Sequence, residues 1–223
     1  MTTFLVTGAN GKLGRHVTQL LLSAKAGTVI AASRDPSKLA DLAEKGAQTR
    51  RADFDDPASL AEAFKGVDRL LLISTDGMAP GQRLAQHAAA IAAAKTAGVG
   101  HVVYTSMPKP ETSAVSFASD HLGTENTLKA SGLAYTILRN SWYQENLFLA
   151  LPPALKSGQW YSSAGDGKIP HIAHADCARA AAAALIQAPV DRTFTLTGPN
   201  GSRRSRSPPW PPPPPANRSP SSN

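Results

Sequence analysis

The chain has 223 residues, of which 42% are hydrophobic and 17% charged, which is enough for one α/β domain with a sizeable core. Its formal net charge is +7, but four arginines follow residue 200, which leaves +3 on residues 1–200 and no argument for nucleic-acid binding. No stretch approaches the ~20 apolar residues of a membrane span, and the N-terminus lacks a secretory pattern. Since the single cysteine, Cys177, can form no intrachain disulfide, these features predict a cytoplasmic protein with a buried, inert thiol.

Short β-rich runs alternate with helical patterns, which is typical of βαβ units. Strands are expected at 4–8, 28–33, 47–53, 69–74, 101–106 and 134–139. Helices are expected at 12–24, 37–46, 57–66, 83–98 and 116–132, several ending at a glycine that suits a left-handed C-terminal residue. Further strands at 159–165 and 193–198 flank a helix at 175–187. The predicted fold class is α/β, a Rossmann-type doubly wound parallel sheet with helices on both faces.

The composition changes abruptly after residue 200. Residues 202–223 read SRRSRSPPWPPPPPANRSPSSN and offer almost nothing apolar to bury, which predicts a disordered or polyproline-like tail. We therefore divide the chain into a domain at 1–201 and a tail at 202–223. Our hypothesis for the tail is a shift of reading frame after about Asn200, and the alternative is a Pro-rich linker or partner ligand. An unshifted frame in the sequenced locus, with no helical coding potential downstream, would refute the hypothesis.

Three glycines follow the first expected strand, in the segment TGANGKLGR. A tight turn followed by a helix that begins near Lys12 places backbone N–H groups where a pyrophosphate can bind. Gly8 then forms the turn, Gly11 admits phosphate and Gly14 lets the helix approach the sheet. A turn and a close helix–strand contact without ligand are the alternative, but the position at the first βα junction favours a dinucleotide. The cofactor-binding prediction here covers Gly8, Asn10, Gly11, Lys12, Leu13 and Gly14.

The end of the second strand indicates which dinucleotide is bound. An NAD site usually has a carboxylate there for the ribose hydroxyls, whereas this chain has Ser33 and Arg34, with Lys38 in the next helix. Cations suit a 2′-phosphate, so NADPH is the predicted cofactor. The alternative is that Arg34 and Lys38 are solvated surface charges, which Asp35 could partly neutralise. Residues that follow the third and fourth strands are expected to border the adenine and the ribose: Asp53, Phe54, Ser74 and Thr75.

Several longer motifs carry a family resemblance over residues 3–200: VTGANGKLGRHV, ASRDPSK, RADFDDPASL, LLLIS, VVYTS, HLGTE, LRNSWYQEN and SAGDGKI. With them the chain resembles the NmrA-like atypical short-chain dehydrogenases, and among these the bacterial NADPH-dependent quinone oxidoreductases. The resemblance implies further helices after the strand at 193–198, which help to form a smaller substrate lobe. Because the Pro-rich tail stands in their place, that lobe is expected to be incomplete.

The acid of typical short-chain dehydrogenases is missing. Those enzymes place a Tyr and a Lys four residues apart on a helix, and the corresponding residues here are Phe117 and His121. Phe has no proton to donate, which argues against ketones, because their reduction builds up a strongly basic alkoxide. A quinone that accepts a hydride becomes a phenol-like anion with a pKa on the order of 10, so solvent can protonate it. The chain is therefore predicted to be an enzyme that transfers a hydride from NADPH to a quinone.

Three catalytic candidates and a substrate pocket follow from this interpretation. Asn140, just after the sixth strand, is expected to orient the nicotinamide carboxamide or a quinone oxygen. Trp142 and Tyr143 are expected to wall a pocket for a flat acceptor, although paired aromatics are often core residues. His121 either binds the nicotinamide ribose or donates a proton, or it is a partly exposed helix residue. The catalytic prediction names His121, Asn140 and Tyr143, and the substrate prediction names Asn140, Trp142 and Tyr143.

Alternatives to this function remain at the level of the sequence. His171 and His174 have a spacing that suits a metal, but no further ligands are in view, so no metal is predicted. Asp176 is expected near the cap of the following helix. A non-catalytic redox sensor of NmrA type would also bind the dinucleotide, and a reductase of other flat molecules, such as triphenylmethane dyes, would also transfer a hydride. The expected partners are a small acceptor and, as one option, a second copy of the chain.

Overall fold

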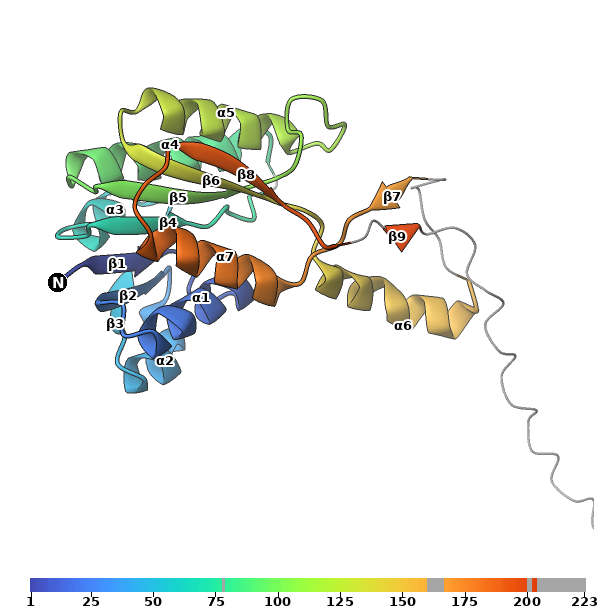
Figure 1. Cartoon of the computed structure of the whole chain (residues 1–223), viewed down its shortest axis with the longest axis horizontal. Helices are drawn as coiled ribbons and strands as arrows, with labels where there is room; N and C mark the ends of the chain where they lie inside the picture. The colour runs from blue at the N-terminus through green and yellow to red at the C-terminus, as the bar shows by residue number, and fades with distance from the viewer. Residues whose placement is uncertain (78, 160–166, 200–201, 204–223) are drawn as a thin grey trace, which may run out of the picture.

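The computed structural model describes residues 1–77, 79–159, 167–199 and 202–203. Its centre is a sheet of strands in the order β3-β2-β1-β4-β5-β6-β8, in which every neighbouring pair is parallel (Figure 1). The strands are β1 (Thr3–Val6), β2 (Thr28–Ser33), β3 (Gln48–Arg51), β4 (Arg69–Leu72), β5 (His101–Ser106), β6 (Ala134–Asn140) and β8 (Arg192–Leu196). The order reverses between β1 and β4, which is where an open α/β sheet forms a crevice for ligands.

Two layers of helices cover the sheet, as Figure 1 shows. One layer contains α1 (Lys12–Ser23), α7 (His174–Ile186) and α2 (Ala40–Glu44), the last preceded by the 3₁₀ turn η1 (Pro36–Leu39). The other contains α3 (Pro57–Ala63), α4 (Gln82–Thr96) and α5 (Ala118–Ala130). Because side chains alternate along a strand, Leu5 packs under the second layer while Phe4 and Val6 pack under the first.

Local sequence signals explain the helix ends. Asp56 caps α3 by accepting from the backbone N–H groups of Ala58 and Ser59, and a proline occupies the first turn. At the C-terminal ends, Gly46, Gly66, Gly98 and Gly132 have φ between 68° and 98°, which confirms the predicted left-handed conformation at these sites. In α1, the stripe of Leu13, Val17 and Leu21 is buried because its four-residue spacing keeps these side chains on one face.

The fold class and the six first strands are confirmed, and the strand expected at 193–198 is β8. The expected helix at 37–46 begins as η1 and continues as α2. Of the strand expected at 159–165, residues 160–165 lie outside the described residues, as do residues 204–223 of the predicted tail. The first two tail residues form β9 (Ser202–Arg203), which pairs antiparallel with β7 (Lys168–Ile169). The predicted boundary between domain and tail stays a prediction.

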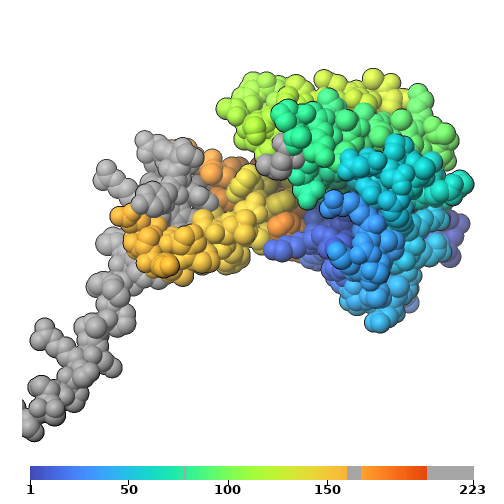
Figure 2. Space-filling view, turned by 180° about the vertical axis from the view of Figure 1, so that it is seen from behind, coloured from blue at the N-terminus to red at the C-terminus, as the bar shows by residue number. Residues whose placement is uncertain are grey.

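Besides the two-residue strands β7 and β9, two elements after β6 were not predicted: η2 (Gln144–Asn146) and α6 (Leu147–Ser157). Pro152 and Pro153 lie inside α6 and act against a helix prediction, because each removes a backbone donor. No residue of α6 is buried, and the helix projects from the sheet-bearing body in both views (Figures 1 and 2). Its most exposed apolar side chains are Phe148 and Leu149, at 65% and 79%. No helix in the described parts of the chain combines the length and apolar character that a bilayer span requires.

Candidate functional site

A cavity of about 390 Å³ lies at the carboxyl edge of β1 to β4. The predicted residues that line it are Gly8, Asn10, Gly11, Arg34, Lys38, Asp53, Phe54, Ser74 and Thr75. The residues that line it without having been predicted are Ser33, Asp35, Ala52, Asp55, Ile73, Asp76 and Gln86. Residues from four separate βα junctions thus meet in one space, because parallel strands present all their carboxyl ends at the same edge.

Three predicted residues lie beside this cavity, in the first turn of α1. Lys12 is exposed, Leu13 belongs to the core, and Gly14 is buried against the turn that precedes the helix. A Cβ added at Gly14 would lie 2.5 Å from the backbone oxygen of Gly8, so the helix approaches this close only because the side chain is absent. Gly14 thus has the packing role that its spacing predicted.

The other two glycines shape the turn between β1 and α1. Gly8 has φ +60°, a left-handed conformation that L side chains rarely adopt. Gly11 is the N-cap of α1 with φ −80°, and a Cβ added there would meet only the backbone oxygen of Gly8, at 3.3 Å. A side chain at Gly11 is therefore much less crowded than one at Gly14, and it would adjoin the cavity that this residue lines.

The cationic end of the cavity follows β2. Arg34 and Lys38 both line the cavity and are exposed. The neighbouring Asp35 accepts from the hydroxyl of Ser37 at 2.6 Å and from its backbone N–H at 3.1 Å. These hydrogen bonds, that of the hydroxyl above all, lower the pKa of the Asp35 carboxyl. Asp35 caps η1, and its carboxylate is 3.7 Å from Lys38 Nζ. The carboxylate thus pairs with Lys38, and Arg34 forms no ion pair within the described chain.

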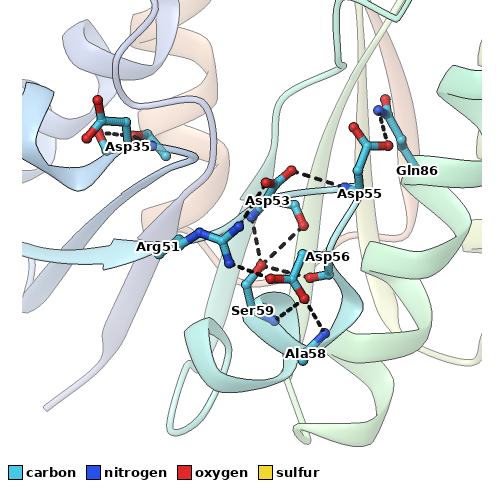
Figure 3. Close-up of polar contacts among 9 residues, drawn as sticks. Asp35, Arg51, Asp53, Asp55, Asp56, Ala58, Ser59 and Gln86 are labelled. Atoms are coloured by element: carbon cyan, nitrogen blue, oxygen red, sulfur yellow. Dashed lines mark hydrogen bonds and ion pairs between the residues drawn. The ribbon is translucent and has the colours of Figure 1, made fainter.

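The loop after β3 is held by a compact polar network (Figure 3). The guanidinium of Arg51 bridges Asp53 and Asp56 at 3.0 and 2.5 Å. The backbone N–H of Asp53 donates to Ser59 Oγ at 2.9 Å, and that of Asp55 donates to Asp53 Oδ1 at 3.2 Å. Since the anchors lie at the end of β3, in the loop and at the start of α3, the backbone that borders the cavity is held by the protein's own hydrogen bonds.

The loop after β4 is anchored by His87 of α4, a residue that no sequence motif singled out. His87 is fully buried, and its Nε2 accepts from the backbone N–H of Thr75 at 3.0 Å. Burial, helped by the nearby cationic charge of Arg83, lowers the pKa of His87 to about 3, so the imidazole is neutral near pH 7. Nδ1 therefore carries the proton and donates to Thr124 Oγ1 at 2.9 Å.

His121 does not line this cavity. Its imidazole is 4% exposed, so it is not the partly exposed helix residue that one reading expected, and Nδ1 is 2.8 Å from the hydroxyl of Tyr104. Burial and the positive charge of Arg83 lower the pKa of His121 to about 4. The helix position that carries Tyr in typical short-chain dehydrogenases holds Phe117, whose ring contacts His121 with centroids 5.8 Å apart and lies 5.0 Å from the Arg83 guanidinium.

The residues predicted to hold the acceptor lie at the end of β6 and just after it. Asn140 is buried, and its Nδ2 donates to the hydroxyl of Tyr143 at 3.1 Å. Its Oδ1 is buried without a hydrogen-bond partner in the described chain. Burial raises the pKa of Tyr143 to about 12 against the opposing effect of the Asn140 hydrogen bond, so this phenol keeps its proton. The ring of Tyr143 stacks on that of His174 with centroids 4.0 Å apart.

Backbone pairing holds this segment in place. Ile172 donates to the carbonyl of Trp142 at 3.1 Å, and its own carbonyl accepts from Gln144 at 2.8 Å. Trp142 is 51% exposed, so it contributes an open apolar surface and is not a core residue. The Glu145 carboxylate lies 2.9 Å from His174 Nδ1 and accepts from the backbone N–H of His174 at the start of α7.

Other polar residues near this edge are occupied structurally. Ser106, the last residue of β5, donates its hydroxyl hydrogen to Glu125 at 2.7 Å, and Arg139 donates to both oxygens of the same buried carboxylate. Asp176 lies in the first turn of α7, as expected. Cys177 is 1% exposed, and burial raises the pKa of its thiol to about 12, which confirms a buried thiol. Within the described ranges, no three potential ligands cluster as a metal site would require.

A glycine turn at the first βα junction, a cationic end after β2 and a seven-strand parallel sheet define a dinucleotide-binding oxidoreductase architecture. Residues 8–189 match the model of the NAD(P)H-binding family, and the chain belongs to this family. It is 44% identical to quinone oxidoreductase 2 of Escherichia coli over 195 residues, which make up 86% of this chain and 68% of that protein.

Two solved structures are similar as well. The NADPH complex of the NADPH-dependent quinone oxidoreductase of Escherichia coli matches with a TM-score of 0.84 and 40% identity, over 90% of this chain and 71% of that one. The NADP(H) complex of the Citrobacter sp. triphenylmethane reductase matches with a TM-score of 0.83 and 33% identity, over 91% and 72%. The resemblance to NmrA-like quinone oxidoreductases is thereby confirmed.

The cavity fits a phosphate-bearing dinucleotide. The absent side chain of Gly11 leaves space next to the N-terminus of α1, where a pyrophosphate binds backbone N–H groups. Thr75 lines the same space, and its hydroxyl is buried with no partner among the described residues. A buried hydroxyl without a partner is unfavourable, and a bound ligand would supply one.

Proposed function

We propose that this chain is an oxidoreductase that transfers a hydride from NADPH to a quinone. The observation that carries the proposal is the meeting of the glycine turn with Arg34 and Lys38 in one cavity, in a chain 44% identical to a quinone oxidoreductase. The balanced reaction consumes one quinone, one NADPH and one proton, and yields one hydroquinone and NADP⁺.

NADPH would be held by residues of the cavity. Gly8 and Gly11 leave room for the pyrophosphate at the start of α1, and Arg34 and Lys38 face the 2′-phosphate. Because Asp35 is committed to Ser37 as the cap of η1, it is poorly placed to accept from a free 2′-hydroxyl. When bound, NADPH supplies the hydride, and the protein's contribution is to hold the coenzyme and the acceptor at the distance and orientation that hydride transfer needs.

At the acceptor end we assign Asn140 and Tyr143. The Tyr143 hydroxyl accepts from Asn140 Nδ2, so its own hydrogen is free to donate to a quinone oxygen. The Asn140 oxygen without a partner would accept from a carboxamide N–H. His121 is neutral near pH 7 and is bonded to Tyr104, which favours a supporting role beneath the site over that of the proton donor. Trp142 would offer its exposed ring to a flat acceptor.

Turnover tests the proposal. The purified chain is titrated with NADPH by fluorescence, and the loss of NADPH absorbance is then followed after addition of a benzoquinone. Consumption that depends on both quinone and protein is the expected result. Binding without consumption would favour a redox sensor and refute the proposed activity.

The acceptor class is tested in the same assay with a triphenylmethane dye, because a reductase of such dyes is 33% identical to this chain. If the dye is turned over faster than any quinone, the dye replaces the quinone as the proposed substrate. Self-association of the chain stays a prediction, which light scattering at several concentrations would test.

A further inference from the structure

Gln86 of α4 is a cavity-lining side chain with one half of its amide engaged. The residue is 8% exposed, and Nε2 donates to Asp55 Oδ1 at 2.8 Å (Figure 3). Oε1 is buried and has no hydrogen-bond partner in the described part of the chain. Burial removes this oxygen from water without supplying another hydrogen bond, which costs free energy, so a hydrogen bond from a ligand donor would be favourable.

The orientation of this amide follows from chemistry. A carboxylate can only accept hydrogen bonds, so the amide nitrogen of Gln86 must face Asp55 and the oxygen must face the other way. Asp55 is itself held, because its backbone N–H donates to Asp53 Oδ1. The side-chain oxygen of Gln86 therefore points away from Asp55 and is left as an unused acceptor on a residue that lines the cavity.

The carboxylates of Asp53 and Asp56 in the same loop are already engaged. Asp53 Oδ1 accepts from the Asp55 N–H, and Asp53 Oδ2 is bonded to Arg51. The carboxylate of Asp56 is divided between Arg51 and the start of α3. Among the polar side chains of this loop and of the adjoining turn of α4, Gln86 is thus the one with an unengaged buried acceptor.

We propose that Gln86 is a specificity-determining residue that accepts a hydrogen bond from the exocyclic amino group of the adenine of the coenzyme. This inference rests on the proposed function. The ring of Phe54, which lines the cavity next to the loop, gives the base an apolar face. The 2′-phosphate of the ribose would bind at the cationic end of the cavity, after β2. Gln86 lines the cavity from α4, next to the loop after β3, where we expect the adenine, and the amino group of the adenine is a hydrogen-bond donor.

The probe is the reduced coenzyme analogue that carries hypoxanthine in place of adenine, so that a carbonyl oxygen replaces the amino group. Dissociation constants of NADPH and of this analogue are measured by fluorescence titration. The unmodified chain is expected to bind NADPH about tenfold more tightly, as one well-placed hydrogen bond and one avoided oxygen–oxygen contact imply. In Gln86→Met the preference is expected to fall to about twofold or less.

A second variant and a control separate this role from simple damage to the loop. Asp55→Asn removes the constraint on the amide, so Gln86 is then able to turn its nitrogen to the hypoxanthine oxygen, and the preference for NADPH over the analogue is expected to shrink. Gln187→Met, at an exposed position after α7, is expected to keep the full preference. Melting temperatures of all variants verify folding.

Three outcomes would overturn the inference. They are equal binding of both coenzymes by the unmodified chain, a preference that survives in Gln86→Met, and a preference lost only in Thr75→Val, whose hydroxyl is the other buried group without a partner in this cavity. If the unmodified chain binds neither coenzyme, the proposed function itself is refuted, and this result is distinct from the three outcomes that refute only the role of Gln86.

Discussion

Alanine at Gly11 and at Gly14 is expected to have opposite consequences, although the two glycines are three residues apart in one turn. At Gly14 the new Cβ would lie 2.5 Å from Gly8 O and 2.9 Å from Ala9 Cα, and these backbone atoms can move only with the turn itself. Overpacking of this kind costs about 1–3 kcal/mol of unfolding free energy. At about 2–4 °C per kcal/mol for a chain of this size, the melting temperature of Gly14→Ala should fall by about 2–12 °C.

At Gly11 the conformation is extended, with φ −80° and ψ 166°, and the only contact of a new Cβ is at 3.3 Å. Alanine is a poorer N-cap than glycine but restricts the unfolded chain, so the net change in stability should stay within about 1 kcal/mol. The methyl group would nevertheless occupy the space of the phosphate, and NADPH affinity should fall by at least about tenfold, or 1.4 kcal/mol.

Thermal melts with and without NADPH, together with a fluorescence titration, separate the two effects. Gly14→Ala should melt early, and Gly11→Ala should melt near the unmodified protein but gain little stabilisation from NADPH. If Gly11→Ala binds NADPH normally, the pyrophosphate does not lie against this turn, and the assignment of the cavity is refuted.

Three further predictions concern charge and protons. Arg34→Ala should lower the affinity for NADPH by about 10- to 100-fold, as for a lost charged hydrogen bond, and leave the affinity for NADH unchanged; equal losses of affinity for both coenzymes would contradict its role at the 2′-phosphate. Tyr143→Phe should lower kcat by less than about 100-fold with NADPH affinity unchanged, since a phenol-like product needs little acid catalysis, and a larger loss in kcat would show that the acid is essential. The buried His87, His101 and His121 have pKa values lowered to about 3, 4 and 4, chiefly by burial. Below pH ~6.5 the unfolded chain therefore binds more protons than the folded one, and each imidazole lowers the unfolding free energy by about 1.4 kcal/mol per pH unit until its folded pKa is reached. Denaturant melts between pH 7 and 5 should show this loss, and His101→Gln should have a shallower slope; an unchanged slope would contradict the burial argument.

The βα alternation was readable from the sequence because burial on both faces of a parallel sheet demands continuous apolar strands, and because several of the crossover helices end at a glycine. The glycine turn and the Arg34–Lys38 pair were also readable, since their spacing places them at the first two βα junctions. Helix α6 was not, because Pro152 and Pro153 oppose a helix locally and no buried face marks one.

The amino-acid sequence by itself determined the fold class, the position of the coenzyme cavity and the lack of the usual Tyr acid at Phe117, because each follows from local patterns: the βα alternation, the residues at successive βα junctions and one four-residue spacing. Only the tertiary structure decided which polar atoms are engaged. It placed His87 against Thr75, bonded Tyr143 to Asn140 and left the side-chain oxygen of Gln86 without a partner among the described residues. Such contacts join different elements, and the burial that shifts a pKa or removes water from an amide oxygen exists only after those elements have packed.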